Sequence, residues 1–228
     1  MLELSVVIPA YREEENLRML LPRLKAVLDE TQVSYEILVV DTQMPLDNTK
    51  GVCLEEQVRY VPREVNNDYA DAVRTGILSA AGTYILFMDG DGSHTPEYVP
   101  QLLQHRQNYD VVSASRYVSG GDTENSFYLI LMSRTVNIAY SLVLGLKCKD
   151  VSNSFKLYKA EQLKQLELRC QNFDVIEEIL FKLNRRFKIK IKEVPFTFKK
   201  RMFGDSKRNL VVFMLTYLYT LLRLRFGR

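Results

Sequence analysis

Apolar residues follow two alternating patterns along the first half of the chain. Short runs rich in Val, Ile and Leu are typical of buried strands, and longer segments with helical spacing are typical of helices that cover a sheet. The predicted strands are Leu4–Ile8, Glu36–Val40, Val58–Val61, Tyr84–Met88 and Asp110–Ser113. The predicted helices are Glu14–Asp29, Thr49–Glu56, Asp68–Ala80 and Pro96–Gln107. This alternation predicts an α/β domain with a mostly parallel central sheet flanked by helices.

The pattern changes in the second half, where apolar segments become longer. Phe127–Leu146 is a long apolar segment, and a helix near Phe173–Asn184 and a strand-like Lys188–Phe198 follow it. The last apolar run, Asn209–Leu222, has 14 residues without a charge, whereas a membrane-spanning helix needs about 20. We therefore expect an amphipathic, interfacial helix over residues 209–228 after a main domain of residues 1–208. The alternative is a helix that docks on the domain or on another subunit.

Composition allows a sizeable core, since the 228 residues are 46% hydrophobic. The net charge of +3 is unevenly distributed: residues 185–228 carry thirteen Lys or Arg and two acids, a balance of +11, which leaves −8 for residues 1–184. A basic end of this kind attracts nucleic acid, anionic lipid headgroups or a pyrophosphate. Its charges are interleaved with apolar residues and no nucleic-acid motif accompanies them, so we expect no nucleic-acid binding.

The cysteines and the N-terminal residues indicate the cellular compartment of the protein. Cys53, Cys148 and Cys170 are too few and too scattered for a disulfide framework, and they form no Cys-x-x-Cys pair. Residues 1–9 contain no basic leader followed by a cleavage site. Both observations favour a reducing, cytoplasmic location.

Residues 87–94, Phe-Met-Asp-Gly-Asp-Gly-Ser-His, follow directly on a predicted strand. Ligands of open α/β sheets bind beyond the carboxyl ends of the strands, which is where Asp89 and Asp91 fall. Two carboxylates in a turn that Gly90 makes tight suit Mg²⁺ or Mn²⁺ together with diphosphate oxygens. Asp-x-Asp also occurs in ordinary surface turns, but Asp41, at the end of another predicted strand, favours a binding site.

A divalent ion at this position would act as a Lewis acid on a departing nucleoside diphosphate. Basic side chains can share that role. Arg116 follows the fifth predicted strand, and Arg201 lies in a basic cluster with Ser206 and Lys207. For the cluster, the alternative is a solvated basic loop.

Several runs resemble family 2 glycosyltransferases of GT-A (nucleotide-diphospho-sugar transferase) fold. Residues 6–17, VVIPAYREEENL, are similar to the opening of these enzymes, residues 37–41 to their second strand, and Asp89-Gly90-Asp91 to their metal motif. Residues 115–121, 150–157 and 194–207 are similar to the dolichol-phosphate mannose synthase and polyprenyl-phosphate glycosyltransferase branch. The resemblance spans roughly residues 4–225 and several motifs in order, which is more specific than any one motif.

The resemblance implies roles for individual residues. The expected nucleotide-sugar pocket consists of Pro9, Tyr11, Glu13, Asp41, Asp89, Gly90 and Asp91. The expected metal ligands for Mg²⁺ or Mn²⁺ are Asp89 and Asp91, which with Arg116 and Arg201 form the expected catalytic set. The expected contacts of the acceptor phosphate are Arg116, Arg134, Arg201, Ser206 and Lys207. Residues 150 and 152 fall in the stretch that the family uses near its acceptor.

The implied reaction is inverting transfer of a hexose from GDP-mannose or a UDP-sugar to a polyprenyl or dolichyl phosphate. A phosphate oxygen is already anionic, so no general base is needed. The implied location is peripheral, at the cytoplasmic face of a membrane, with an anchoring partner or a homo-oligomer as further options. One alternative is transfer to a glycan hydroxyl in surface polysaccharide synthesis, with Asp150, Asp174 or Glu177 as base. Another is a non-catalytic nucleotide-sugar-binding member.

The chain departs from the family pattern at several positions. Arg12 replaces a common Asn, and Thr42–Leu46 replaces further acids, which leaves the base preference open. Ser93 stands where relatives often have a metal-binding Gln, and Leu129 where they often have an Arg. We expect altered metal and phosphate contacts. His94 either compensates at the metal or is only hydrogen-bonded.

Overall fold

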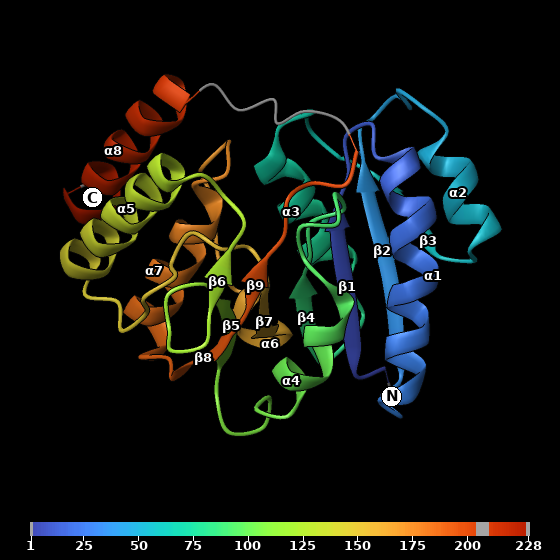
Figure 1. Ribbon diagram of the computed structural model, residues 1–228, viewed down its shortest axis with the longest axis horizontal. Coiled ribbons are helices and arrows are strands. Elements are labelled where there is room, and N and C mark those ends of the chain that lie inside the picture. The colour runs from blue at the N-terminus through green and yellow to red at the C-terminus, as the bar shows by residue number, and fades with distance from the viewer. Residues whose placement is uncertain (1, 204–209, 227–228) are drawn as a thin grey trace.

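The computed structural model describes residues 2–203 and 210–226 and, for residues 210–215, the helical backbone alone (Figure 1). A seven-stranded sheet forms its centre, in the order β3-β2-β1-β4-β7-β5-β8. The strands are β1 Leu4–Pro9, β2 Tyr35–Asp41, β3 Arg59–Pro62, β4 Tyr84–Phe87, β5 Val111–Ser115, β7 Lys156–Lys159 and β8 Ile191–Pro195. A separate parallel pair joins β6 Asp122–Thr123 to β9 Thr197–Phe198.

The sheet is mostly parallel, as the alternation of elements predicts. Only β7 among these seven strands is antiparallel, and it lies between β4 and β5. The sequence did not predict β7, because four residues that begin and end with Lys carry no clear strand pattern. The predicted strand Lys188–Phe198 divides into β8 and β9 on either side of Phe196.

The helices are α1 Glu14–Glu30, α2 Thr49–Glu55, α3 Tyr69–Ser79, α4 Val99–Leu103, α5 Phe127–Leu144, α6 Ala160–Leu163, α7 Val175–Phe187 and α8 Leu210–Phe226. The four helices predicted in the first half are present. The fourth is shorter than predicted: a 3₁₀ turn, Pro96–Tyr98, precedes α4, and turns replace helix after Leu103. Pro100 follows closely on Pro96, and each removes a backbone donor, which favours short helical pieces.

Strand β1 shows why the helices form two layers. Its side chains alternate between the faces of the sheet. Val6 and Ile8 join the core under α1, α2 and α4, whereas Val7 joins the core under α3, α5, α7 and α8. The sheet is therefore buried on both faces, which accounts for its nearly continuous apolar strands.

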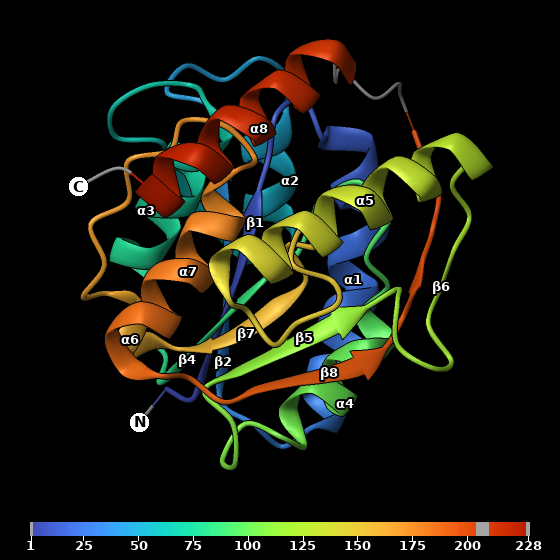
Figure 2. The same ribbon diagram turned by 90° about the vertical axis from the view of Figure 1, so that its left-hand side faces the viewer.

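Helices α5 and α8 run side by side on the outside of α7 (Figures 1 and 2). Tyr140 of α5 donates its hydroxyl to the Tyr217 carbonyl of α8 at 2.7 Å. Of the described helices, α5 is long and apolar enough to cross a membrane, and 22% of it is buried in the protein. Both helices leave large apolar side chains in solvent: Phe127, Tyr128, Leu131, Ile138, Leu142, Leu218, Tyr219, Leu222 and Phe226. One face of α8 thus docks on the domain, and the interfacial role of the other face stays a prediction.

Candidate active site

The carboxyl ends of β1, β2, β4 and β5 meet at one edge of the sheet, the upper edge in Figure 1. Pro9 and Asp41 are the last residues of β1 and β2, and the loops that leave β1, β4 and β5 carry Tyr11, the Asp89–His94 turn and Arg116. The structure therefore brings the predicted site residues of four separate segments to one edge.

The two acids of the Asp89–His94 turn, which we call the metal motif, are partly exposed. The side chain of Asp89 is 21% exposed and that of Asp91 is 23% exposed. Asp89 Oδ1 accepts a hydrogen bond from Ser154 Oγ at 2.9 Å. Asp91 Oδ1 accepts from Ser93 Oγ at 2.6 Å and from the Ser93 N–H at 3.0 Å. Each carboxylate is thus oriented through one oxygen.

The segment 199–203 lies against the metal motif. Lys199 N–H donates to the Ser93 carbonyl at 3.1 Å, and Met202 N–H donates to the Asp91 carbonyl at 3.0 Å. Gly92 has a φ of +80°, and a Cβ placed there would come within 2.5 Å of Met202 Cε. The positive φ favours glycine here, and the absence of a side chain lets Met202 pack against the turn.

Arg201 brings a positive charge to the metal motif. Its Nη1 lies 3.7 Å from Asp91 Oδ2, and its Nη2 donates to Glu13 Oε1. Glu13 also accepts from Asn16 Nδ2 at 2.6 Å. Burial raises the pKa of Glu13, against the opposing effect of Arg201. Arg201 therefore links Glu13 and Asp91, which are both expected to contact the nucleotide sugar.

The predicted nucleotide side contains one deeply buried acid. Asp41 ends β2 with no exposed surface and accepts from the Tyr60 hydroxyl at 3.2 Å. Burial raises the pKa of Asp41. Pro9 ends β1 on the same edge, and Tyr11, 38% exposed, lies at its rim. Contact of these residues with a nucleotide stays a prediction.

Arg63 was missed by sequence reasoning. It follows β3 and is almost fully buried. Its Nη2 donates to the Ala10 carbonyl at 2.6 Å, and its Nη1 donates to the Asp68 carbonyl at 3.2 Å. Burial lowers the pKa of Arg63, and the nearby Asp41 raises it. The signal was available, because Arg63 is the first charged residue after a predicted strand that ends at this edge.

On the predicted acceptor side, Arg116 is paired with Asp150. Arg116 Nε and Nη2 donate to the two carboxylate oxygens at 2.8 and 2.6 Å, and the Arg116 N–H adds a bond of 2.8 Å. Burial acts to raise the pKa of Asp150, but the guanidinium keeps it below its ordinary value. The pair organises segment 150–155, and contact of Arg116 with a phosphate stays a prediction.

The remaining predicted acceptor residues lie near this pair or outside the described residues. The guanidinium of Arg134 lies 5.4 Å from the centre of the Tyr117 ring, and that of Arg116 lies 5.0 Å from it. Tyr117 thus brings the two cations together. Ser206 and Lys207 lie outside the described residues.

His94 is hydrogen-bonded inside the metal motif, which was one of its two predicted roles. Its Nδ1 accepts from the Asp89 N–H at 2.9 Å, and its Nε2 lies 3.1 Å from Asn153 Oδ1. Burial lowers the pKa of His94, although the acids 89 and 91 act to raise it.

Within residues 2–203 and 210–226, no three His, Cys, Asp or Glu side chains cluster as a complete metal site. Two partly exposed carboxylates still fit a hard divalent cation, because Mg²⁺ is usually bound by one or two carboxylates together with substrate phosphates and water. Asp89 and Asp91 would hold such an ion.

Comparison with known proteins identifies the family. The model described as "Glycosyl transferase family 2" matches residues 5–167. This chain belongs to glycosyl transferase family 2.

A dolichol-phosphate mannosyltransferase of Pyrococcus furiosus is 32% identical over 97% of the chain, which spans 64% of that relative's length. The dolichol-phosphate mannosyltransferase of Saccharomyces cerevisiae is 30% identical, covering 99% of the chain and 89% of the relative. The undecaprenyl-phosphate mannosyltransferase of Micrococcus luteus is 29% identical, with coverage of 89% and 86%.

Solved structures confirm the predicted GT-A fold of this family 2 chain. Glucosyl-3-phosphoglycerate synthase from Mycobacterium tuberculosis, in complex with Mn²⁺, UDP and glucosyl-3-phosphoglycerate, superposes with a TM-score of 0.75 at 18% identity. The match covers 98% of this chain and 80% of that one. The same enzyme with Mg²⁺ and UDP also gives 0.75. At this identity the likeness establishes the fold, and donor and acceptor must be argued from the site.

Proposed function

We propose that this chain is an inverting, metal-dependent glycosyltransferase that moves a hexose from GDP-mannose or a UDP-sugar to a polyprenyl or dolichyl phosphate. The observation that carries the proposal is the pair of partly exposed carboxylates of Asp89 and Asp91, held beside Arg201 at the carboxyl edge of the sheet. Similarity to dolichol-phosphate and undecaprenyl-phosphate mannosyltransferases supports the lipid-phosphate acceptor.

The residues at the carboxyl edge of the sheet have different roles in the proposed reaction. Mg²⁺ or Mn²⁺, when bound to Asp89 and Asp91, supplies a Lewis acid for the diphosphate. Arg201 adds positive charge beside the leaving group. Arg116 and Arg134, which flank Tyr117, draw the acceptor phosphate to the opposite side. An acceptor that is already anionic needs orientation more than deprotonation.

The burial of the candidate bases favours a phosphate acceptor over a glycan hydroxyl. Asp150 is fully buried and paired with Arg116. Asp174 accepts from Thr220 Oγ1 at 2.5 Å, and Glu177 is fully buried under α8. A general base must come within hydrogen-bond reach of the proton that it removes. These three carboxylates are not presented at the described surface.

The membrane-facing part of the proposal rests on α5 and α8. The two helices lie side by side (Figure 2), and both carry exposed apolar side chains, with Arg223 and Arg225 in the last turn of α8. Apolar surface of this kind, with basic residues near it, suits the cytoplasmic face of a membrane that carries anionic lipid. We propose a peripheral attachment there, with an anchoring partner or homo-oligomer as an addition that this surface permits.

Donor and acceptor are tested in two steps. Thermal unfolding is measured with GDP, UDP, GDP-mannose and UDP-glucose, each with and without Mn²⁺, because a ligand of the folded state raises the melting temperature. Transfer from the stabilising donor is then measured to a polyprenyl phosphate and to a soluble glycan. We expect metal-dependent stabilisation and transfer to the lipid phosphate alone. Transfer to the glycan alone contradicts the acceptor assignment, and binding without any transfer favours a non-catalytic member.

A further inference from the structure

His94 lies in a hydrogen-bonded chain whose direction can be deduced. The Asp89 N–H can only donate, so His94 Nδ1 accepts, and the proton of the neutral ring lies on Nε2. Nε2 therefore donates to Asn153 Oδ1 at 3.1 Å. The Asn153 amide in turn donates to the Ala114 carbonyl of β5 at 2.8 Å. The metal motif is thus joined to β5 through two side chains.

Aromatic rings hold the imidazole in place. The His94 ring is stacked on Phe155, with centroids 4.8 Å apart and planes at 10°. Phe196 and Phe198 meet it edge-on at 5.7 and 5.8 Å. The imidazole is fully buried, so it cannot turn toward a cation in solvent without leaving this packing. Its place is behind the carboxylates of the metal motif.

Ser154 and His94 are the neighbours of the Asp89 carboxylate. Asp89 Oδ1 accepts from Ser154, the neighbour of Asn153, and His94 Nε2 lies 3.6 Å from Asp89 Oδ2. Both oxygens of this carboxylate therefore have a neighbour that segment 150–155 supplies or orients. The other end of that segment holds Arg116 through Asp150. A shift of the segment would move the metal motif and the Arg116 pair together.

We propose that His94 and Asn153 are a positioning pair that aims the Asp89 carboxylate at the cation and couples the metal motif to the acceptor-side segment 150–155. The inference rests on the proposed function in assigning the cation to Asp89 and Asp91. Partners that orient metal ligands are worth about 10–100-fold in metal affinity. A buried histidine that only fills the core would contribute to stability and leave the cation affinity unchanged.

Two variants of His94 separate these roles. In His94→Asn, the amide oxygen lies near the position of Nδ1 and can still accept from the Asp89 N–H. In His94→Gln, the amide lies near the position of Nε2, so Asn153 keeps a partner and the Asp89 N–H loses its acceptor. Gln is one methylene larger than Asn, so a core role predicts a smaller loss of stability for His94→Gln, whereas the positioning role predicts the larger loss of Mn²⁺ affinity for that variant. Asn153→Ala keeps the imidazole and removes its link to β5.

The experiment measures the Mn²⁺ concentration for half-maximal binding of GDP or UDP, whichever the wild type binds, by calorimetry on the full chain, with Tm recorded for each variant. We expect an increase of about tenfold or more for His94→Gln, which removes the acceptor of the Asp89 N–H, and a smaller increase of about threefold for Asn153→Ala and for His94→Asn, which both keep that acceptor and break the link between positions 94 and 153. His105→Asn, at a ring that meets Tyr109 edge-on at 6.1 Å, is the control and should change neither quantity.

The outcomes distinguish the two proposals. Equal Mn²⁺ requirements in wild type, His94→Gln and Asn153→Ala, with only Tm lowered, would overturn the positioning role and leave the proposed function standing. The same conclusion follows if His94→Asn and His94→Gln raise the requirement equally. A wild type that binds neither nucleotide in the presence of Mn²⁺ contradicts the proposed function and removes the basis of the inference with it. Should His94→Gln fail to fold, Asn153→Ala decides the matter alone.

Discussion

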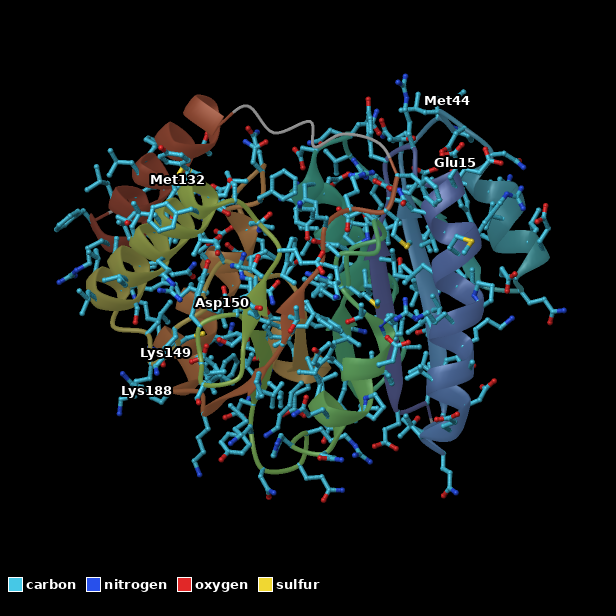
Figure 3. All side chains as sticks on the ribbon, in the orientation of Figure 1. Glu15, Met44, Met132, Lys149, Asp150 and Lys188 are labelled. Carbon is cyan, nitrogen blue, oxygen red and sulfur yellow. The ribbon has the colours of Figure 1, made fainter. Side chains whose placement is uncertain are left out.

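The metal motif, on the predicted donor side (residues 4–94), and the segment 150–155, on the predicted acceptor side (residues 111–198), differ in how far their acids are exposed. In Figure 3, Glu15 and Met44 mark the donor side and Met132 and Asp150 the acceptor side, toward opposite ends of the long axis. On the donor side, Asp89 and Asp91 keep about a fifth of their side chains in solvent. On the acceptor side, Asp150 is fully buried and neutralised by Arg116.

The difference distinguishes carboxylates that are free to bind a ligand from carboxylates that are paired within the fold. A buried ion loses hydration and needs a partner within the fold, whereas a partly exposed carboxylate can exchange water for a cation. The carboxylates at the metal motif therefore belong to binding, and the Asp150–Arg116 pair belongs first to the architecture of the acceptor side.

The largest effect is expected at the metal motif. Asp89→Ala and Asp91→Ala should each lower the transfer rate by about 1000-fold or more, because several kcal/mol of charge stabilisation in the transition state is lost. Neither side chain belongs to the apolar core, so Tm should change little. Rates at saturating Mn²⁺ and melting curves provide the measurement, with the exposed Glu30→Gln as control. Unchanged turnover in both variants would contradict the site.

The next effect concerns the buried pair. Arg116→Met leaves Asp150 buried without its partner and should lower the free energy of unfolding by about 3–5 kcal/mol. Adding Asp150→Asn removes the uncompensated charge, so the double variant should recover much of that loss. Denaturant unfolding measures both. If Arg116→Met is as stable as wild type and loses only transfer, the side chain serves the phosphate rather than the fold.

A smaller effect, dependent on pH, is expected at Glu177. Burial raises its pKa from 4.5 to about 8, with Lys156, Asp174 and Tyr217 among its neighbours. The folded state thus binds an extra proton between these values, and this group's contribution to stability is lost as pH rises from about 5 to 8, at up to about 1.4 kcal/mol per pH unit.

Glu177→Gln removes this dependence, so its gain in free energy of unfolding over wild type should be larger at pH 8 than at pH 5. Denaturant unfolding at both pH values measures the difference. Subtracting the wild-type curve isolates Glu177 from Lys156, whose pKa burial lowers. A pH-independent difference between the two proteins would contradict the buried, protonated carboxyl.

The smallest effect is expected at the outer surface of α5 and α8. Leu142→Glu and Leu222→Glu each place a charge on this exposed apolar surface and should weaken binding to anionic vesicles by about tenfold, with Tm unchanged. Co-sedimentation with vesicles containing phosphatidylglycerol measures it. Leu54→Glu, on an exposed residue of α2, is the control. Vesicle binding that falls equally in all three variants would argue against a specific surface.

Sequence reasoning predicted the donor side better than the acceptor side. The strands β1, β2 and β4 are continuous apolar runs, and each is followed by a residue with recognisable chemistry, as Asp89 shows after β4. On the acceptor side, β7 was missed because Lys156, buried at its first position, resembles a surface residue in sequence. Its burial follows from the pairing of β7 with β4 and β5, which are distant in the chain, and no local pattern reveals it.

The sequence by itself determined the layered α/β fold and the family, because buried strands and ordered motifs have local signatures. It also placed Asp89 and Asp91 directly after a strand, and their role at a metal stays a prediction. Only the tertiary structure decided that Arg116 is paired with Asp150, that Arg63 reaches the end of β1, and that His94 lies behind the carboxylates. In each case a buried charged or polar group replaces its hydrogen bonds to water with a partner in the protein. The choice of partner is made between segments distant in the chain, and it follows from their packing.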